Sequence, residues 1–372
     1  MRFTPGRLAA LAALLLAAPI TQAQTVVKIG AAFSLTGNAA AYGAQQKAGV
    51  LLAVDEINKS GKLPGITLEA VVEDDGTNPQ QGIQVFDRFI NRDKVSAILG
   101  PTLSTLAEAA DPRAQEQKTP VVAVSNTKPN AITTIGDYIW RVSLTEAQVI
   151  PSAIEIARGK LGFKTAGLLY GNDDAFTKAG YDVMKATLEK QGVQILGTQT
   201  FSTKDRDFNA QLTALKNLKP DILFVSALVE QAGSIAVQAR QLGYTGPIMG
   251  GNGFNSTKFI QLGGPAAEGV LVGTAWNRVS PDPVNLAFIK AMQARGTDPD
   301  QFCAQAYTGV LVIAEAIKLA GNKGGRDDIK AGFAKVKDLP TPLGKFSFLP
   351  SRDGNHAAAV QVVKGGKFEI MQ

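Results

Sequence analysis

Residues 97–130 read AILGPTLSTLAEAADPRAQEQKTPVVAVSNTKPN, and this stretch decides the predicted fold. Ala97-Ile98-Leu99 form a short apolar strand that ends at Gly100-Pro101, after which Thr102-Leu103-Ser104-Thr105 open a helix. Residues 120–124 (PVVAV) repeat this design and end in Ser125-Asn126-Thr127. Two such strand endings about twenty residues apart predict neighbouring strands of a parallel sheet, whose carboxyl ends open on one edge.

Hydroxyl groups at that edge predict an anion site. Ser104 lies at a helix N-terminus, where backbone N–H groups and the helix dipole favour a negative charge. Ser125 and Thr127 follow the next strand, so both loops converge on one small carboxylate. The alternative is that Ser104 and Ser125 only cap or end local structure, which is the usual role of serine near a helix start. No base that would activate a nucleophile is visible nearby.

The rest of the chain repeats an α/β rhythm in two halves. The first half has strands at 26–33, 66–72, 97–99, 120–124 and 138–142, with helices between them, and the chain leaves it near Thr145. The second half has strands at 165–170, 193–201, 221–225, 247–249 and 268–274. Helices at 283–295, 301–319 and 326–336 and strands at 357–363 and 367–370 follow. This order predicts an α/β fold with parallel sheets covered by helices on both faces.

The N-terminus has the pattern of a secretory signal peptide. Arg2 and Arg7 precede an apolar run from Leu8 to Ala18, and small residues at Thr21 and Ala23 predict cleavage after Ala23. The mature chain would have 372 − 23 = 349 residues, which exceeds what one hydrophobic core usually supports. We therefore expect an exported protein of two lobes in the periplasm. Cys303 lies far from the cleavage point, so no N-terminal cysteine is available for a lipid anchor.

The sequence gives little support to disulfides, to common catalytic motifs, to metal sites or to nucleic-acid binding. The chain has a single cysteine, Cys303, which excludes an intramolecular disulfide. A Ser-His-Asp triad would depend on the single histidine, His356. This histidine lies in a predicted turn, where we expect it to be solvated or to lie between the lobes. P-loop and GxSxG motifs are absent. Gly251-Asn252-Gly253 is a turn that permits close backbone approach, and the pairs Asp74-Asp75 and Asp173-Asp174 are typical of caps and turns. We expect no metal and no cofactor, and the scattered charges give nucleic-acid binding little support.

The chain resembles the periplasmic leucine/isoleucine/valine-binding proteins of ABC importers, in the type I periplasmic binding fold. Similar stretches occur in order along nearly the whole mature chain. They are Lys28-Ile29-Gly30-Ala31, Leu35-Thr36-Gly37, Tyr42-Gly43, 54–58 (VDEIN), Glu73-Asp74-Asp75 through Pro79, Leu99-Gly100 with Ser104, Asn126-Thr127, 204–208 (KDRDF) and Ala267-Glu268-Gly269.

The resemblance implies two Rossmann-like lobes joined by a three-crossing hinge, with crossings near Thr145, Ala275 and Ala357. It places residues 24–145 and 276–357 in the first lobe, and 146–275 and 358–372 in the second. The lobes would close over a small ligand held between them.

The resemblance also implies individual ligand contacts. Family positions that hold an α-carboxylate correspond to Ser104, Ser125 and Thr127, in agreement with the anion site above. Tyr42 matches the first-lobe tyrosine, and Phe176, in the loop after the strand at 165–170, stands for the second-lobe aromatic residue. Two departures concern the second lobe. Asn252 replaces the family acid that binds the ligand ammonium, and Leu228 replaces a tyrosine. Glu146 or Glu230 could compensate for the missing acid.

The sequence thus predicts a solute-binding protein of an ABC importer and not an enzyme. It would bind a small hydrophobic amino acid of the branched-chain type and deliver it to an inner-membrane permease as a monomer. Because Asn252 is neutral, an amine-free ligand such as an aromatic or branched organic acid, or an amide, is an alternative. A sensory ligand-binding module and an amidohydrolase that uses Ser104 or Ser125 are further alternatives.

Overall fold

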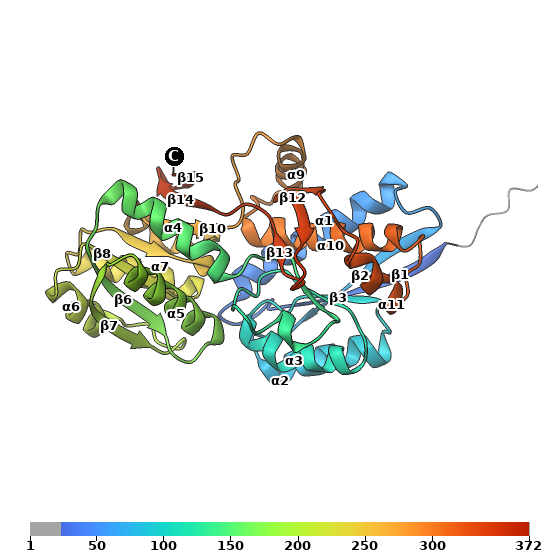
Figure 1. Ribbon diagram of the computed structural model, residues 1–372, viewed down its shortest axis with the longest axis horizontal. Coiled ribbons are helices and arrows are strands. Elements are labelled where there is room, and N and C mark those ends of the chain that lie inside the picture. Colours follow the sequence, from blue (N-terminus) through green and yellow to red (C-terminus); the bar gives the residue numbers. More distant parts are fainter. Residues whose placement is uncertain (1–23, 372) are drawn as a thin grey trace, which may run out of the picture.

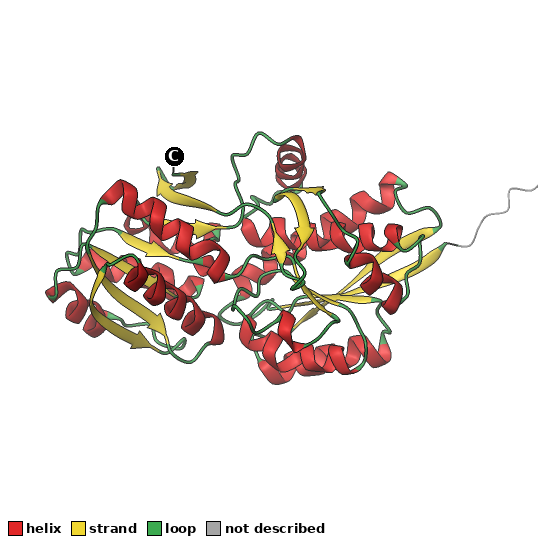
Figure 2. Ribbon diagram, viewed as in Figure 1, coloured by secondary structure: helices red, strands yellow, loops and turns green. Residues whose placement is uncertain are grey.

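The computed structural model describes residues 24–371, so the predicted signal peptide lies outside the described residues. The chain forms two α/β lobes side by side, as predicted (Figure 1). In each lobe, helices flank a largely parallel sheet (Figure 2). The N-terminal sheet shares one hydrophobic core with helices between residues 283 and 333, and the middle of the chain supplies the other lobe.

The first lobe contains a five-stranded sheet in which all paired strands are parallel. Its strands, in spatial order, are β2 (Ile66–Asp74), β1 (Thr25–Phe33), β3 (Ala97–Leu99), β4 (Val121–Ala123) and β5 (Ile139–Arg141). The intervening elements are α1 (Ala40–Ser60), α2 (Pro79–Asp87), a π-helical turn η1 (Arg88–Arg92), α3 (Ser104–Glu116) and η2 (Thr133–Ile135). Helix α2 starts as predicted, because the Asn78 side chain accepts hydrogen bonds from the N–H groups of Gln80 and Gln81.

Three later helices return to the first lobe: α9 (Pro283–Ala294), α10 (Gln301–Leu319) and α11 (Arg326–Phe333). Helix α10 is long and apolar enough to cross a membrane by composition, yet most of it is buried inside the protein. It packs along α1, where Gly49 lies against the backbone of Cys303. Its apolar character is therefore explained by its position in the core.

The second lobe contains a seven-stranded sheet. Its spatial order is β15 (Lys367–Ile370), β14 (Ala359–Lys364), β10 (Leu271–Thr274), β9 (Ile248–Gly250), β8 (Ile222–Ser226), β6 (Thr165–Gly171) and β7 (Gln194–Phe201). The last two strands in sequence, β14 and β15, pair in antiparallel fashion. The helices are α4 (Glu146–Leu161), α5 (Ala175–Lys190), α6 (Asn209–Asn217), α7 (Val229–Gln241) and α8 (Thr257–Gly263), with short turns η3 (Asn252–Phe254) and η4 (Gly264–Ala267).

Two details of the fold differ from the sequence prediction. The strand expected at 268–274 begins only at Leu271, because residues 264–267 form the short helix η4 and residues 268–269 form a turn. A small antiparallel sheet of β11 (Leu339–Thr341), β12 (Gly344–Phe348) and β13 (Gly354–Asn355) was not predicted. These strands are very short, and β12 is fixed by burial of Phe346 in the core of the first lobe.

The chain passes between the two sheets three times, between β5 and α4, between β10 and α9, and between β13 and β14. At the first passage Thr145 and Gln148 form a capping box that fixes the start of α4. The Gln148 side chain also donates to the carbonyl of Gly354, 3.0 Å away, beside the third passage. The first and third passages are thus tied to each other directly.

Candidate functional site

A small cavity lies at the contact between the lobes. It brings together six of the seven predicted ligand residues, Tyr42, Ser104, Ser125, Phe176, Leu228 and Asn252, with Thr102, Leu103, Gly253 and Phe302. Its free volume is about 10 Å³, which is roughly the room for one water molecule. The seventh predicted residue, Thr127, lines an adjacent cavity of similar size with Glu146, and both cavities share Asn252.

Ser104 provides a donor edge to the first cavity. It is the first residue of α3, and the preceding Leu103 is extended and makes no side-chain cap. The Ser104 hydroxyl oxygen accepts only a long bond, 3.4 Å, from the N–H of Lys128. Within residues 24–371, the backbone N–H groups of Ser104, Thr105 and Thr127 donate no hydrogen bond. This end of α3 can therefore offer several free donors to an anion.

The Ser125 hydroxyl is engaged inside the first lobe. It donates to the carbonyl of Thr102 at 2.6 Å and accepts from the side chain of Gln46 at 2.7 Å. The Gln46 oxygen in turn accepts from the Thr102 hydroxyl at 2.6 Å. In this conformation Ser125 therefore ties the two loops together, which is the structural role that the sequence left open for it. Gln46 gives no sequence signal for this role, because it lies within the first helix.

Thr127, Glu146 and Asn252 meet at the adjacent cavity. One carboxylate oxygen of Glu146 accepts from the Thr127 hydroxyl at 3.3 Å and from the backbone N–H of Asn252 at 3.2 Å. Burial raises the pKa of Glu146 to about 7, although both bonds oppose that shift. The side-chain oxygen of Asn252 accepts from the Gln301 amide at 2.6 Å. Gln301 is a second contact that the sequence did not reveal.

Aromatic side chains close the other side of the first cavity. Tyr42 stacks on Phe302 with ring centroids 4.2 Å apart, and its hydroxyl donates to the carbonyl of Gly253 at 2.7 Å. A side chain at position 253 would meet the carbonyl of Ala227 at 2.1 Å, so glycine permits the predicted close approach of the backbone. Phe302 was missed because an aromatic residue within a predicted helix usually signals only core packing.

The loop position predicted for Phe176 is wrong. Phe176 is the second residue of α5, because the Asp174 side chain accepts from the N–H of Thr177 at 3.0 Å and starts the helix there. The side chain nevertheless lines the cavity, together with Leu228 at the start of α7. The apolar wall predicted for the second lobe is therefore formed by two helix starts.

Further contacts hold the lobes together around the cavities. The Thr105 hydroxyl of α3 donates to Asp174 of α5 at 2.5 Å and accepts from the N–H of Ala175 at 3.0 Å. Asn38 of the first lobe donates to the carbonyl of Thr203 in the second at 3.2 Å. The small cavity volumes and these bonds describe two lobes that are closed on each other.

The other acidic pairs serve local structure, as predicted. Asp74 accepts from the N–H groups of Leu35, Thr36 and Gly76, and Asp173 accepts from Ser202 and Thr203. Among residues 24–371 no group of three or more His, Cys, Asp or Glu side chains is placed to hold a metal ion.

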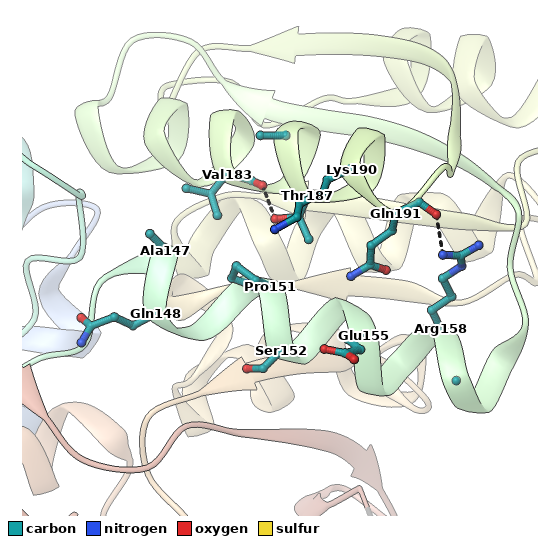
Figure 3. Close-up of a pocket in the computed structure, with 12 residues that line it drawn as sticks. Ala147, Gln148, Pro151, Ser152, Glu155, Arg158, Val183, Thr187, Lys190 and Gln191 are labelled. Atoms are coloured by element: carbon teal, nitrogen blue, oxygen red, sulfur yellow. Dashed lines mark hydrogen bonds between the residues drawn. The ribbon is translucent and has the colours of Figure 1, made fainter.

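A larger hollow, about 1080 Å³, is an open groove between α4 and α5 on the second lobe (Figure 3). Gln148, Pro151 and Thr187 lie along it, and none of the predicted ligand residues lines it. Its charged side chains, among them Glu155, Arg158 and Lys190, are of both signs.

Comparison with known proteins agrees with the fold. The family model described as periplasmic binding protein matches residues 26–367. The leucine-, isoleucine-, valine-, threonine- and alanine-binding protein of Pseudomonas aeruginosa is 29% identical over 333 residues, which cover 89% of this chain and 88% of that protein.

Solved structures give the same result. A branched-chain amino acid transporter substrate-binding protein of Streptococcus pneumoniae, in complex with isoleucine, superposes with a TM-score of 0.87 and 29% identity over 93% of this chain and 99% of that one. An ABC transporter solute-binding protein of Rhodopseudomonas palustris, in complex with 3,4-dihydroxybenzoic acid, gives 0.82 and 26% over 92% and 95%. With a family match over nearly its whole length, two α/β lobes and a cavity between them, the chain belongs to the periplasmic binding protein family.

Proposed function

We propose that this protein is the solute-binding component of an ABC importer and that it binds a small hydrophobic amino acid between its lobes. The observation that supports this most directly is the cavity that gathers Tyr42, Ser104, Ser125, Phe176 and Leu228 at the contact of the two lobes. Its wall combines polar groups, such as Ser104 of the first lobe, with apolar side chains from both lobes, such as Phe302 of the first and Phe176 of the second. That combination matches a ligand with a charged head and an apolar side chain.

The first lobe binds the ligand carboxylate. The hydroxyl and backbone N–H of Ser104, at the start of α3, and the N–H of Thr127 are donors that an anion can use. Ser125 contributes by holding the two donor loops in register through Gln46 and Thr102. The carboxylate thus replaces water at donors that the helix itself leaves without partners.

The second lobe completes the site by closing over the ligand. Phe176 and Leu228 cover the apolar side chain, and Asn252 approaches from the turn after β9. The hinge lies at the three chain passages near Thr145, Ala275 and Ala357. On this proposal the first lobe consists of residues 24–145 and 276–357, and the second lobe consists of residues 146–275 and 358–372. Ligand binding shifts the population toward the closed form, which a permease can then recognise.

The cellular setting follows from the same proposal. Residues 1–23 direct export, and the mature protein works in the periplasm as a monomer that delivers its ligand to an inner-membrane permease. The relatives named above are binding proteins, which supports a binding function over amidohydrolase chemistry. Incubation of the purified protein with simple amides should give no hydrolysis product.

A second candidate ligand is an aromatic organic acid without an amine. Asn252 is neutral and already receives a hydrogen bond from Gln301, so it offers no negative charge to an ammonium group. The Rhodopseudomonas palustris neighbour was solved with 3,4-dihydroxybenzoic acid, which shows that this architecture accepts such ligands elsewhere in the family.

A thermal-shift screen of the mature protein separates the two candidates. The panel contains leucine, isoleucine, valine and phenylalanine, their 2-oxo acids, benzoate and 3,4-dihydroxybenzoate, and simple amides. A ligand at 100 times its dissociation constant should stabilise the protein by about 2.7 kcal/mol. A shift with the amino acids supports the proposal, whereas a shift with aromatic acids alone assigns the second candidate. No shift with any carboxylate would contradict both.

A further inference from the structure

Glu146 occupies an unusual position at the junction of the lobes. It is the first residue of α4, directly after the first passage of the chain between the sheets, and its side chain is only 1% exposed. The carboxylate lies between Thr127 of the first lobe and the turn at Gly251-Asn252 of the second. It also lines the cavity that it shares with both Thr127 and Asn252.

The Glu146 carboxylate has few hydrogen-bond partners within the protein. One oxygen accepts the two long bonds from Thr127 and Asn252, and the other oxygen is buried without any partner among residues 24–371. No ion pair in that part of the chain includes Glu146. A buried carboxylate without a cation or a full set of donors is costly, so a group that supplies both would be bound strongly.

A helix-capping role does not explain this arrangement. An acidic residue in the first turn of a helix is favourable, because it faces the positive end of the helix dipole. At α4, however, Thr145 and Gln148 already form the capping box, and a first-turn acid needs no burial to interact with the dipole. Gly251 has a related feature, since a Cβ there would lie 2.9 Å from the unpartnered oxygen of Glu146. The glycine leaves room for the carboxylate at this point.

We propose that Glu146 binds the ammonium group of the ligand and thereby restricts the site to α-amino acids over the corresponding 2-oxo acids. This inference rests on the proposed function, because it assumes that a carboxylate is held by the α3 edge and Thr127. In an α-amino acid the ammonium and carboxylate groups share one carbon atom, so their binding groups must be neighbours. Thr127 meets this condition, because its hydroxyl contacts Glu146 while its N–H remains free.

In this arrangement the negative charge beside the cavity comes from Glu146 of α4 and not from residue 252. Asn252, whose side-chain oxygen accepts from Gln301, carries no charge, whereas Glu146 approaches the same cavity from α4. Burial raises the pKa of Glu146 to about 7, so the carboxyl group is partly protonated at neutral pH when no cation is present. An ammonium group beside it would favour the ionised form and expel that proton to the buffer.

The test compares the full mature protein with the Glu146→Gln variant by isothermal titration calorimetry. The probes are L-leucine, L-valine and L-phenylalanine, each beside its 2-oxo acid. Loss of a hydrogen bond to a charged group corresponds to roughly a 10- to 100-fold weaker affinity. We expect E146Q to lose about this much for the amino acids while its affinity for the 2-oxo acids stays within about threefold of the unmodified protein.

A second readout would not respond to a merely structural role. Repeating the titrations in buffers of different ionisation enthalpy measures protons released on binding. At pH 6, below the pKa of Glu146, amino acids should release close to one proton, and at pH 8 far less. The 2-oxo acids should release none, and E146Q should release none with any probe. Glu230→Gln, in the first turn of α7, is the matched control, and it should leave both affinity and proton release unchanged.

The outcomes separate this inference from the proposed function. Suppose that the unmodified protein binds amino acids. If E146Q then lowers the affinities for amino acids and 2-oxo acids equally, or lowers neither affinity, the role of Glu146 is contradicted while the proposed function stands. If the unmodified protein binds 2-oxo acids and no amino acid, the ammonium assignment is also overturned. Binding of neither class would refute the proposed function and this inference with it. Should E146Q fail to fold, the proton-release measurement on the unmodified protein decides the question alone.

Discussion

Ser104 and Ser125 lie at the same edge of the first sheet but use their hydroxyl groups differently. Ser104 accepts one long bond and keeps its proton for a ligand, whereas Ser125 both donates and accepts within its own lobe. Arg141 adds a second layer, because its buried guanidinium donates to the carbonyls of Asn126 and Lys128 and to Asp353. The loop that carries Thr127 is therefore held by side chains remote in sequence.

The two serines predict separable effects on binding and stability. Ser104→Ala should weaken binding of the carboxylate ligand by roughly 10- to 100-fold and leave the free energy of unfolding almost unchanged. Ser125→Ala should lower the free energy of unfolding by about 1–3 kcal/mol, because the Gln46 amide then loses its buried partner. Calorimetric titration and urea unfolding of both variants check this. Equal effects of the two substitutions on stability would contradict the assignment.

His356 predicts a pH dependence of stability. Burial lowers its pKa to about 4, and one ring nitrogen lies 3.2 Å from the carbonyl of Val142. Because the pKa in the folded state lies below the usual value near 6.5, the unfolded state binds more protons between these values. The contribution is therefore fully present above about pH 6.5 and is lost as pH falls toward 4.

The size of this effect is limited by the half-buried position of the ring, so we expect about 1–3 kcal/mol across that range. Urea unfolding of the unmodified protein and of His356→Gln between pH 4 and 8 measures it. The unmodified protein should lose stability relative to the variant as pH falls. Parallel stability curves would show that the histidine is not linked to folding. Because it is the single histidine of the chain, no other histidine can mask the result.

At the scale of elements, the strands and helices with a clear apolar period could be predicted from the sequence. The helix starts at Asn78-Pro79 and the strand endings at Gly100 and Val124 carry local signals, and the structure confirms them. The small sheet β11–β13 could not be predicted, because its pairing depends on contacts with the rest of the first lobe and not on local propensity. The contact between α1 and α10 was equally hidden, since the two helices are far apart in sequence.

The α1–α10 contact yields a test with two glycines. A Cβ at Gly49 would lie 2.4 Å from the carbonyl oxygen of Cys303, so Gly49→Ala should force the helices apart and cost about 1–3 kcal/mol. Gly159, within α4, has no atom within 4 Å of such a Cβ, and Gly159→Ala should stabilise the protein by about 0.5–1 kcal/mol. Opposite shifts in thermal unfolding are expected. Similar shifts for the two variants would mean that the α1–α10 contact at Gly49 leaves room for a methyl group.

At the scale of the whole molecule, the sequence anticipated which residues would surround the cavity but not what holds them. Tyr42 and Phe176 were expected from their places at strand and helix ends and Leu228 from the family resemblance, and all three line one cavity. Phe302, which stacks on Tyr42, and Gln301, which donates to Asn252, both belong to α10, far along the chain from these partners. Such pairings arise from the crossing of the chain between lobes, which no local pattern in the sequence encodes.

Several polar contacts join the closed lobes, and Thr105 makes two of them. Its hydroxyl links the start of α3 in one lobe to Asp174 and Ala175 at the start of α5 in the other. Thr105→Val keeps the side-chain shape but leaves the buried Asp174 oxygen without this donor when the lobes are closed. In the open form water can replace it, so the substitution should favour opening.

We therefore expect Thr105→Val to weaken ligand binding by roughly 5- to 100-fold, because the energetic cost of about 1–3 kcal/mol applies only to the closed form. Small-angle X-ray scattering should show a larger radius of gyration for the variant at low ligand concentration, and saturating ligand should restore the compact form. Thr105→Ser retains the hydroxyl and should behave like the unmodified protein. If the valine variant binds and scatters like the serine variant, the bond between Thr105 and Asp174 does not contribute to closure, and the other contacts between the lobes, such as those of Tyr42 and Asn38, must hold them together without it.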